Sequence, residues 1–240
     1  MTWRFGRPRG TLLVWSRAWG SRVSCPVCEK RKAERFCPAK GEKICAVCCG
    51  TEREVSIDCP LDCSYLIAAH RYEDQHQREL SEDTPLLDVK VSQDVIYTHQ
   101  NLLSGIAFAV AKFSAAHHNT TDPEVLAALQ ALAETYKTLG SGIIYEKPPN
   151  SPLPRELYAT LAQFLNESKQ QSDERPGAQA FVPAGPIKDS EVFSLLVFLY
   201  RMGLLRTNGR PRARRFLEFL RGQFPAAPEL KREESRIIVP

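Results

Sequence analysis

Residues 25–63 read CPVCEKRKAERFCPAKGEKICAVCCGTEREVSIDCPLDC and contain all eight cysteines of the 240-residue chain. One tetrahedral zinc ion needs four thiolates, so this stretch carries enough ligands for two ions. Proline and glycine stand between the cysteine groups, and both residue types favour the turns that bring ligands together. The segment therefore predicts a small module that is built around metal.

Disulfide bonds are the competing explanation, and they require a secreted chain. The longest apolar run near the N-terminus, Leu12–Trp15, is too short for the core of a signal peptide. Two thiolates in a C-x-x-C pair can face one ion from a tight turn, whereas a disulfide there closes only a very small loop. Spacing and compartment both favour metal.

The adjacent cysteines Cys48 and Cys49 point in different directions, so they are expected to serve different ions. We predict one site from Cys25, Cys28, Cys45 and Cys48, and a second, interleaved site from Cys37, Cys49, Cys59 and Cys63. Exchange of Cys37 between the sites stays open. Two cross-braced ions would stabilise a segment that is too small for an apolar core of its own. His70 and His76 follow closely, and we expect both on a solvated helix face.

Four thiolates close a tetrahedral site, whereas a catalytic zinc keeps one position open for water. Both zinc ions are therefore predicted to be structural.

The blocks CPVC, FCPA, ICAVCCGTER and CPLDCSYL together resemble a group of uncharacterised bacterial zinc-binding proteins with eight cysteines. The likeness covers residues 25–66. It implies zinc binding and an accompanying helical region. The segment is also distantly similar to B-box and HIT-type zinc fingers, from which it departs because no second cysteine closely follows Cys37 and closing histidines are missing.

Charge is distributed unevenly along the chain. Residues 1–20 carry +4, residues 66–200 carry −7 and residues 201–240 carry +6. Two zinc ions on eight thiolates would lower the charge of residues 21–65 from +1 to −3, which argues against this module as a DNA-binding element. Because no apolar stretch is long enough for a membrane span, we expect a soluble, cytoplasmic protein.

The expected fold class is mainly α, with a zinc module followed by a helical bundle. Five segments are expected along the chain. They are a basic disordered arm or start-site extension (1–20), the double zinc module (21–66), a helix and linker (67–92), the bundle (93–222) and a flexible tail (223–240). Within the bundle the pattern predicts one long buried helix over 93–118. A second begins with Asp122 as its cap and ends at Gly140 or Gly142, and a third covers 154–168. The apolar segment 189–205 is expected at the centre of the core.

Seven arginines surround the last two predicted helices, with Glu218 as the acidic residue among them. In a helix–turn–helix interpretation, the residues that would meet nucleic acid are Arg210, Arg212, Arg214 and Arg215. The other interpretation is a helical hairpin whose arginines balance the acidic body or contact a protein, and we favour it.

No pair of residues resembles a nucleophile with its base, so the sequence favours a non-enzymatic protein. The leading hypothesis is an adaptor or regulatory protein that combines a structural zinc module with a helical protein-interaction domain. The alternative is a nucleic-acid-binding regulator that uses the arginine-rich hairpin.

Overall fold

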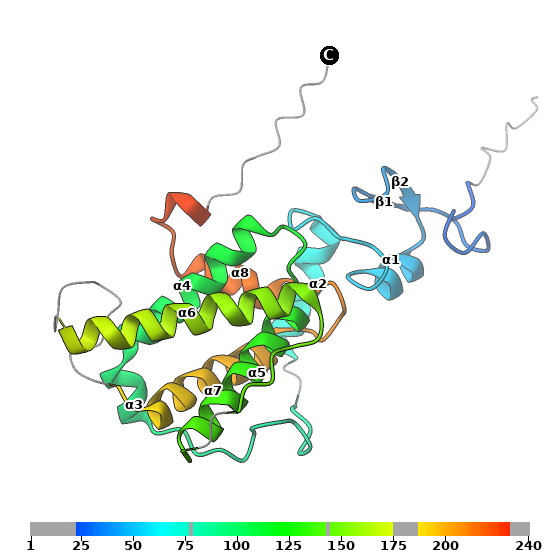
Figure 1. Cartoon of the computed structure of the whole chain (residues 1–240). Coiled ribbons are helices and arrows are strands. Elements are labelled where there is room, and N and C mark those ends of the chain that lie inside the picture. The colour runs from blue at the N-terminus through cyan, green and yellow to red at the C-terminus, as the bar shows by residue number, and fades with distance from the viewer. Residues whose placement is uncertain (1–22, 77–78, 143–144, 175–186, 231–240) are drawn as a thin grey trace, which may run out of the picture. The chain divides into compact units, whose positions relative to one another are not determined.

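The computed structural model describes residues 23–76, 79–142, 145–174 and 187–230, without the side chains of 171–174. The expected arm over residues 1–20 lies outside these ranges. The fold is mainly α-helical, as predicted, and its strands lie in the cysteine-rich segment (Figure 1). The chain divides into an N-terminal unit, residues 1–51, and a helical unit, residues 52–240. This division falls inside the segment that the sequence assigned to the zinc module, at residues 21–66.

The N-terminal unit contains one two-stranded antiparallel sheet. Strand β1 (Arg35–Cys37) pairs with β2 (Glu42–Ile44), with Phe36 opposite Lys43. Gly41 closes the turn between them at φ 68°, a conformation that glycine adopts without steric cost. Helix α1 (Ala46–Glu52) follows directly, and the side chain of Ile44 in front of it is fully buried.

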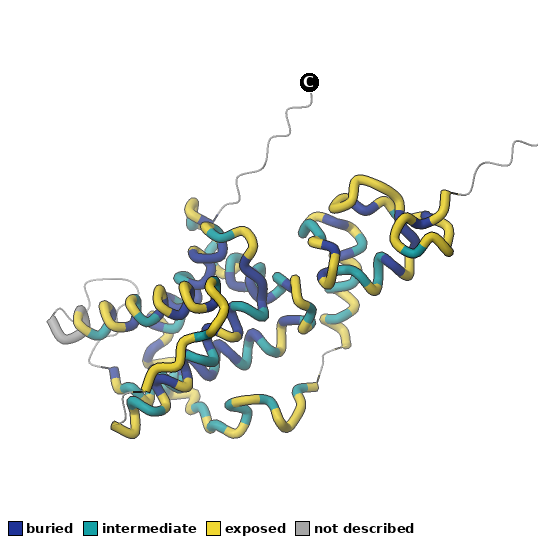
Figure 2. The backbone as a smooth tube through the Cα atoms, turned by 45° about the vertical axis from the view of Figure 1, so that its right-hand side comes forward, coloured by how far each residue is buried: buried dark blue, intermediate teal, exposed yellow. Residues whose placement is uncertain are grey.

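The helical unit is built around the contact between two 18-residue helices, α5 (Asp122–Leu139) and α7 (Asp189–Arg206). Helix α6 (Pro152–Glu174) packs on α5 and on α4 (Gln100–Ala116), and α8 (Arg215–Gly222) packs on α4, α5 and α7. Helix α2 (Ser64–Gln75) precedes the bundle. Buried residues line the inward faces of the bundle helices (Figure 2).

Helix α7 is central to this core, as its nearly uniform apolar sequence predicted. Its Gly203 lies against side chains of both α5 and α8. A Cβ atom at this position would lie 2.7 Å from Leu126 Cδ2 and 2.8 Å from Phe216 Cε1. Glycine therefore allows the three helices to pack together.

The expected single helix over 93–118 is wrong, because the chain forms two helices that meet at His99. The first is α3 (Gln93–Thr98), whose N-cap Ser92 accepts a hydrogen bond from the N–H of Asp94. The second is α4. His99 leaves helical geometry at φ −110° and ψ 27°, and its side chain is buried with Nε2 3.7 Å from a carboxylate oxygen of Glu191 on α7. A tertiary contact thus accompanies the break.

The start of α5 also differs from the prediction that Asp122 is its cap. Thr121 is the N-cap residue, and the carboxylate of Glu124 accepts hydrogen bonds from its N–H (2.8 Å) and its hydroxyl (3.0 Å). Asp122 is fully buried and binds another helix. Pro123 lies in the first turn, where a missing N–H costs nothing.

Residues 81–92, which form the linker part of the predicted segment 67–92, are held on the bundle instead. Leu86, Val89 and Val91 pack against the core, and the Arg201 guanidinium of α7 donates to the carbonyls of Leu86, Leu87 and Val89. Apolar contacts and charged hydrogen bonds therefore fix this segment.

The first part of the predicted flexible tail, residues 223–230, is packed as well. The ring of Phe224 meets that of Phe108 on α4 edge-on, with centroids 5.3 Å apart. A short 3-10 helix, η1 (Pro228–Leu230), places Leu230 in the core. The apolar residues of this segment explain the difference, and residues 231–240 lie outside the described chain.

Candidate metal centre

Four cysteine side chains of the N-terminal unit converge. The Sγ atoms of Cys25, Cys28, Cys45 and Cys48 all lie within 4.8 Å of one another, and those of Cys28 and Cys45 are 3.9 Å apart. Zinc–sulfur bonds of about 2.3 Å in a tetrahedron place the sulfur atoms roughly 3.8 Å apart. The cluster is therefore compact enough to share one metal ion, and it is the quartet that the sequence assigned to the first site.

A tight turn presents the first pair of thiols. The N–H of Glu29 donates to the carbonyl of Cys25, and the N–H of Cys25 donates to the carbonyl of Arg31, both at 2.7 Å. Glu29 adopts a positive φ of 55°, which reverses the chain directly after Cys28. Both thiols of this C-x-x-C pair consequently face the same point.

Strand β2 and helix α1 present the second pair. Cys45 follows Ile44 at the end of the strand, and Cys48 lies in the first turn of α1. The N–H of Cys45 donates to Cys25 Sγ at 3.2 Å, and the N–H of Cys48 donates to Cys45 Sγ at 3.3 Å. Backbone N–H groups directed at sulfur stabilise thiolates, the form in which cysteine binds metal.

The thiols also differ in their tendency to ionise. Hydrogen bonds from the backbone of Lys30 and Arg31 lower the pKa of Cys28 to about 6. Burial, together with the neighbouring sulfur atoms of the cluster, raises the pKa of Cys48 to about 12. Four negative sulfur atoms repel one another at this distance, and a divalent cation at their centre removes that repulsion. The electrostatics of the cluster therefore suit a bound metal ion.

The other four cysteines divide between the two units. Cys37 ends β1 and Cys49 lies on α1, both in the N-terminal unit, whereas Cys59 and Cys63 belong to the helical unit. Cys63 is the N-cap residue of α2. All eight cysteines are in the described chain and none is in a disulfide, but within that part of the chain only the first quartet clusters as metal ligands do. The second site stays a prediction.

The arginines proposed for nucleic acid have partners inside the helical unit. Arg214 pairs with Asp58 and donates to the carbonyl of Thr120, while Arg215 pairs with Glu73 and Asp74 on α2. These contacts accord with the charge-balancing role that we favoured. No observation supports nucleic-acid binding, which stays a prediction.

The other two of these arginines lie on the loop between α7 and α8. The guanidinium of Arg210 donates to the carbonyl of Arg53, and its N–H donates to Asn208 Oδ1 at 3.1 Å. Arg212 has an exposed side chain, and its N–H donates to the carbonyl of Glu54 at 2.8 Å. The loop is therefore attached to residues 53–54 by its own backbone and side chains.

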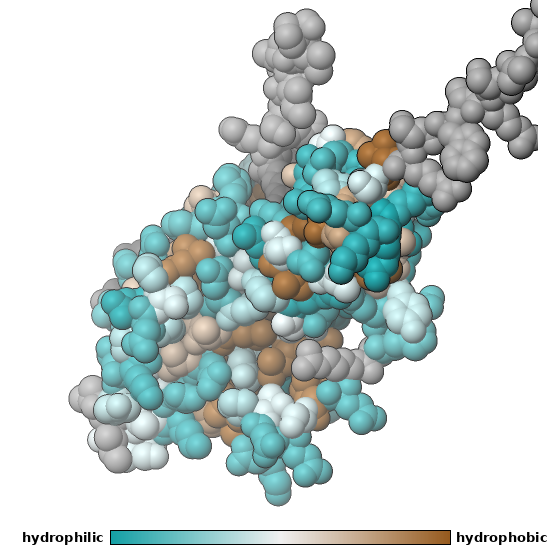
Figure 3. Space-filling model, turned by 90° about the vertical axis from the view of Figure 1, so that its right-hand side faces the viewer, coloured by the Kyte–Doolittle hydropathy of each residue, from teal (hydrophilic) through white to brown (hydrophobic). Residues whose placement is uncertain are grey.

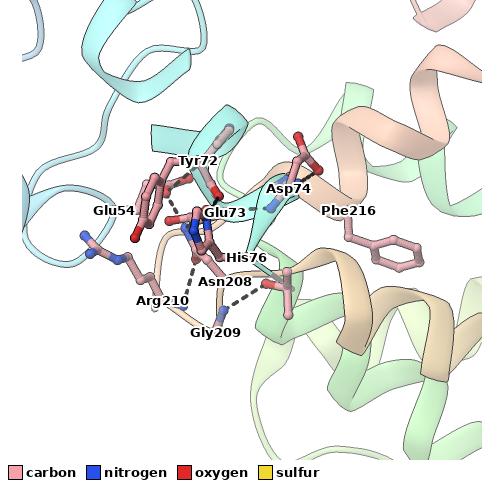
Figure 4. Close-up of polar contacts among 12 residues, drawn as sticks. Glu54, Tyr72, Glu73, Asp74, His76, Asn208, Gly209, Arg210 and Phe216 are labelled. Carbon is pink, nitrogen blue, oxygen red and sulfur yellow. Dashed lines mark hydrogen bonds and ion pairs between the residues drawn. The ribbon is translucent and has the colours of Figure 1, made fainter. Parts of the chain in front are cut away.

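Sequence reasoning missed a buried carboxylate in the helical unit, Glu54, which is 2% exposed. Its Oε2 accepts a hydrogen bond from Asn208 Nδ2 at 2.7 Å (Figure 4) and lies 3.3 Å from His70 Nε2. Burial raises the pKa of Glu54, but the hydrogen bonds from His70 and Asn208 and the charges of His70 and Arg210 outweigh this, so the pKa is lowered overall. His70 thus faces a buried acid, which corrects its expected place on a solvated face; His76 is exposed.

No pattern in the sequence marks this network, because 154 residues separate Glu54 from Asn208. A weak signal was the dipeptide Asn208-Gly209, which is typical of a turn.

In the described parts of the chain, every helix is too short or too polar to cross a bilayer. Comparison of the chain with protein-family models, with curated proteins and with solved structures finds no match.

Proposed function

We propose that this chain is a non-enzymatic zinc protein in which a structural zinc module is joined to a helical domain that binds a protein partner. The observation that carries the proposal is the mutual approach of four Sγ atoms to within 4.8 Å.

Zinc is the metal that this ligand set favours. Four thiolates in tetrahedral spacing suit zinc and the iron of iron–sulfur proteins, and the C-x-x-C spacing of both pairs is typical of structural zinc sites. Four protein ligands leave no position for water or substrate, so the ion would stabilise the fold rather than act as a Lewis acid. The described part of the N-terminal unit is small, and metal would supply stability that its few buried side chains cannot.

A second zinc ion on Cys37, Cys49, Cys59 and Cys63 completes the proposal. Successive residues of a helix point about 100° apart, so Cys49 on α1 turns away from the ion that Cys48 would bind. Its thiol is half-buried, and Cys37 and Cys63 are buried. Burial of thiols in a chain without disulfides supports a second metal ion.

A protein partner is supported by apolar side chains at the surface of the N-terminal unit. Val23, Phe36 and Val47 are 64%, 54% and 47% exposed. A module stabilised by metal can expose such residues because it does not depend on them for its core. Aromatic residues are enriched in protein interfaces, and Phe36 is the aromatic residue of this group.

Metal content tests the zinc proposal directly. We expect two zinc ions per chain after purification under reducing conditions, with every thiol protected from a mild thiol reagent until a chelator is added. A content of one zinc ion per chain would support the first site and reject the second. Iron, or no metal with oxidised thiols, would reject the zinc proposal as a whole.

The partner is tested separately on zinc-loaded protein. We expect Phe36→Asp to abolish co-purification of a partner that wild-type protein retains at high salt. Ala159→Asp introduces the same charge at an exposed site on α6, outside the N-terminal unit, and serves as the matched control. Equal retention by wild type and Phe36→Asp would reject this surface as the interface.

A further inference from the structure

A cavity of about 660 Å³ opens in the helical unit between the end of α2, the C-terminal half of α7 and the loop that leads to α8. Pockets for small molecules typically measure about 300–1,000 Å³. The zinc proposal gives this cavity no role, because all of its lining residues belong to the helical unit and none is a cysteine.

One wall of the cavity is apolar. Phe198, Met202 and Leu205 are spaced four and three residues apart, which places them on one face of α7. Phe198 and Leu205 are outside the bundle core, and Leu205 is 57% exposed. Helix α7 thus carries a second apolar face in addition to the one that it buries. Figure 3 shows apolar residues gathered between hydrophilic ones on the molecular surface.

The remaining lining is charged, with an excess of arginine. Four arginines face two carboxylates, those of Glu73 and Asp74, and this leaves a formal charge of +2. Adding Glu54, which lies behind Asn208, still leaves the group positive. The cavity therefore favours an anion.

The partners of two arginines fix their positions without neutralising them. Arg201 is held by backbone carbonyls, and the guanidinium carbon of Arg206 lies 3.4 Å from the centroid of the Phe219 ring. The other two face acids: the charge of Arg210 acts on Glu54, and Arg215 pairs with Glu73 and Asp74. A guanidinium bound to a neutral partner keeps its charge available to a carboxylate or a phosphate.

The polar side of the cavity is also held in place before any ligand arrives. Asn208 donates to Glu54 and, at 3.5 Å, to Glu73, and the N–H of Gly209 donates to the hydroxyl of Thr207 at 3.3 Å (Figure 4). The bond to Glu73 joins the loop between α7 and α8 to α2. A pre-organised lining lowers the ordering cost of binding.

We infer that this cavity binds a small amphiphilic anion, whose carboxylate or phosphate head meets the arginines while its apolar part lies on Phe198, Met202 and Leu205. The two head groups share the chemistry that a guanidinium recognises. An apolar molecule without charge, or an anion without an apolar part, satisfies only half of the lining.

Calorimetric titration of the full, metal-loaded chain tests the inference with four probes. Octanoate and octyl phosphate carry both parts, octanol carries only the apolar part and acetate only the head. We expect one site per chain for at least one of the first two probes. Octanol and acetate should bind at least about tenfold more weakly, because each loses one set of contacts. The stronger of the two charged probes identifies the head group.

Two exposed wall residues supply variants that keep the fold. Leu205→Glu and Arg206→Glu should each weaken binding of the stronger probe by about tenfold or more. Arg212→Glu makes the same charge change as Arg206→Glu on an exposed side chain that does not line the cavity, and should change the affinity less than about twofold. In NMR spectra the amide of Gly209 and the side-chain amide of Asn208 should shift on titration.

The inference is overturned if neither charged probe binds, if octanol binds as tightly as octanoate, or if the Leu205 and Arg206 variants bind like wild type. Metal content plays no part in these outcomes, so failure here leaves the zinc proposal intact.

Discussion

The carboxylate of Asp122 accepts the backbone N–H of Phe216 at 3.0 Å, although 94 residues separate the two in the sequence. Its other oxygen accepts the N–H of Leu217 at 3.1 Å, and the N–H of Asp122 donates to the carbonyl of Ala213 at 2.7 Å. A side chain from the start of α5 therefore caps the N-terminus of α8, where free N–H groups and the helix dipole favour a negative charge.

Replacing Asp122 should cost stability through this long-range cap. We expect Asp122→Ala to lower the free energy of unfolding by about 2–3 kcal/mol, since two N–H groups lose a charged acceptor in a buried position. Asp122→Asn keeps one acceptor oxygen and should lose less. Urea titration followed by circular dichroism measures both. Asp94→Ala, at an exposed site on α3, is the control and should lower the free energy of unfolding only slightly. An equally small loss for Asp122→Ala would contradict the role of Asp122 as a cap.

Glu54 should make the helical unit sensitive to acid. Its pKa lies below the ordinary value of 4.5, so its folded carboxylate resists protonation more than the unfolded one. Its contribution to stability is therefore fully present above that value and is lost as the pH falls through the lowered pKa. Comparing the unfolding free energy between pH 6 and pH 3 checks this.

The variant Glu54→Gln removes the titrating group and should flatten that part of the pH profile. Glu29→Gln, at an exposed residue of the other unit, should leave it unchanged. Profiles of equal slope for wild type and Glu54→Gln would reject Glu54 as the source of the acid sensitivity.

Cys45→Ser should remove a metal ion and leave the bundle folded. The Sγ atom of Cys45 belongs to the first quartet and lies 3.9 Å from that of Cys28, so we expect one ion fewer per chain and loss of NMR dispersion for residues 23–51. The helix signal near 222 nm should change little, because most helical residues lie in the helical unit. His76→Asn, which changes an exposed histidine, is the control, and unchanged metal content in Cys45→Ser would reject the ligand assignment.

Arg201 should determine whether residues 81–92 stay on the bundle. Arg201→Met keeps the apolar length of the side chain but leaves three carbonyls without their donor, and we expect a loss of about 2–3 kcal/mol. Amide hydrogen exchange over residues 86–91 should accelerate. Arg155→Met removes a guanidinium that also binds two carbonyls, those of Pro149 and Asn150, but at an exposed site, and it should cost far less.

Gly203→Ala should destabilise the crossing of α5, α7 and α8 even though alanine is the better helix former. The added methyl group would lie within 3 Å of Leu126 and Phe216, and such overpacking typically costs about 1–3 kcal/mol. Gly222→Ala, where nothing lies within 4 Å, is the matched control. Equal thermal unfolding midpoints for the two variants would contradict the close approach at Gly203.

Features that depend on local pattern could be predicted from the amino-acid sequence. Spacing assigned Cys25, Cys28, Cys45 and Cys48 to one site, because ligands in C-x-x-C pairs are positioned by a single turn. The apolar run of α7 indicated its central place, and Gly140 correctly marked the end of α5. These signals act over a few residues, within the range of one helical turn or one C-x-x-C turn.

Which distant side chains meet could be seen in the folded chain alone. The local pattern predicts Asp122 as the cap of its own helix, but Asp122 caps α8, and the helix break at His99 coincides with a contact to Glu191 on α7. The contacts of Glu54 with Asn208 and of Arg201 with Leu87 have no local signature, because each joins residues more than a hundred positions apart. The physical reason is that propensity and periodicity are short-range properties of the chain, whereas burial of a charge is settled by the partners that folding brings to it.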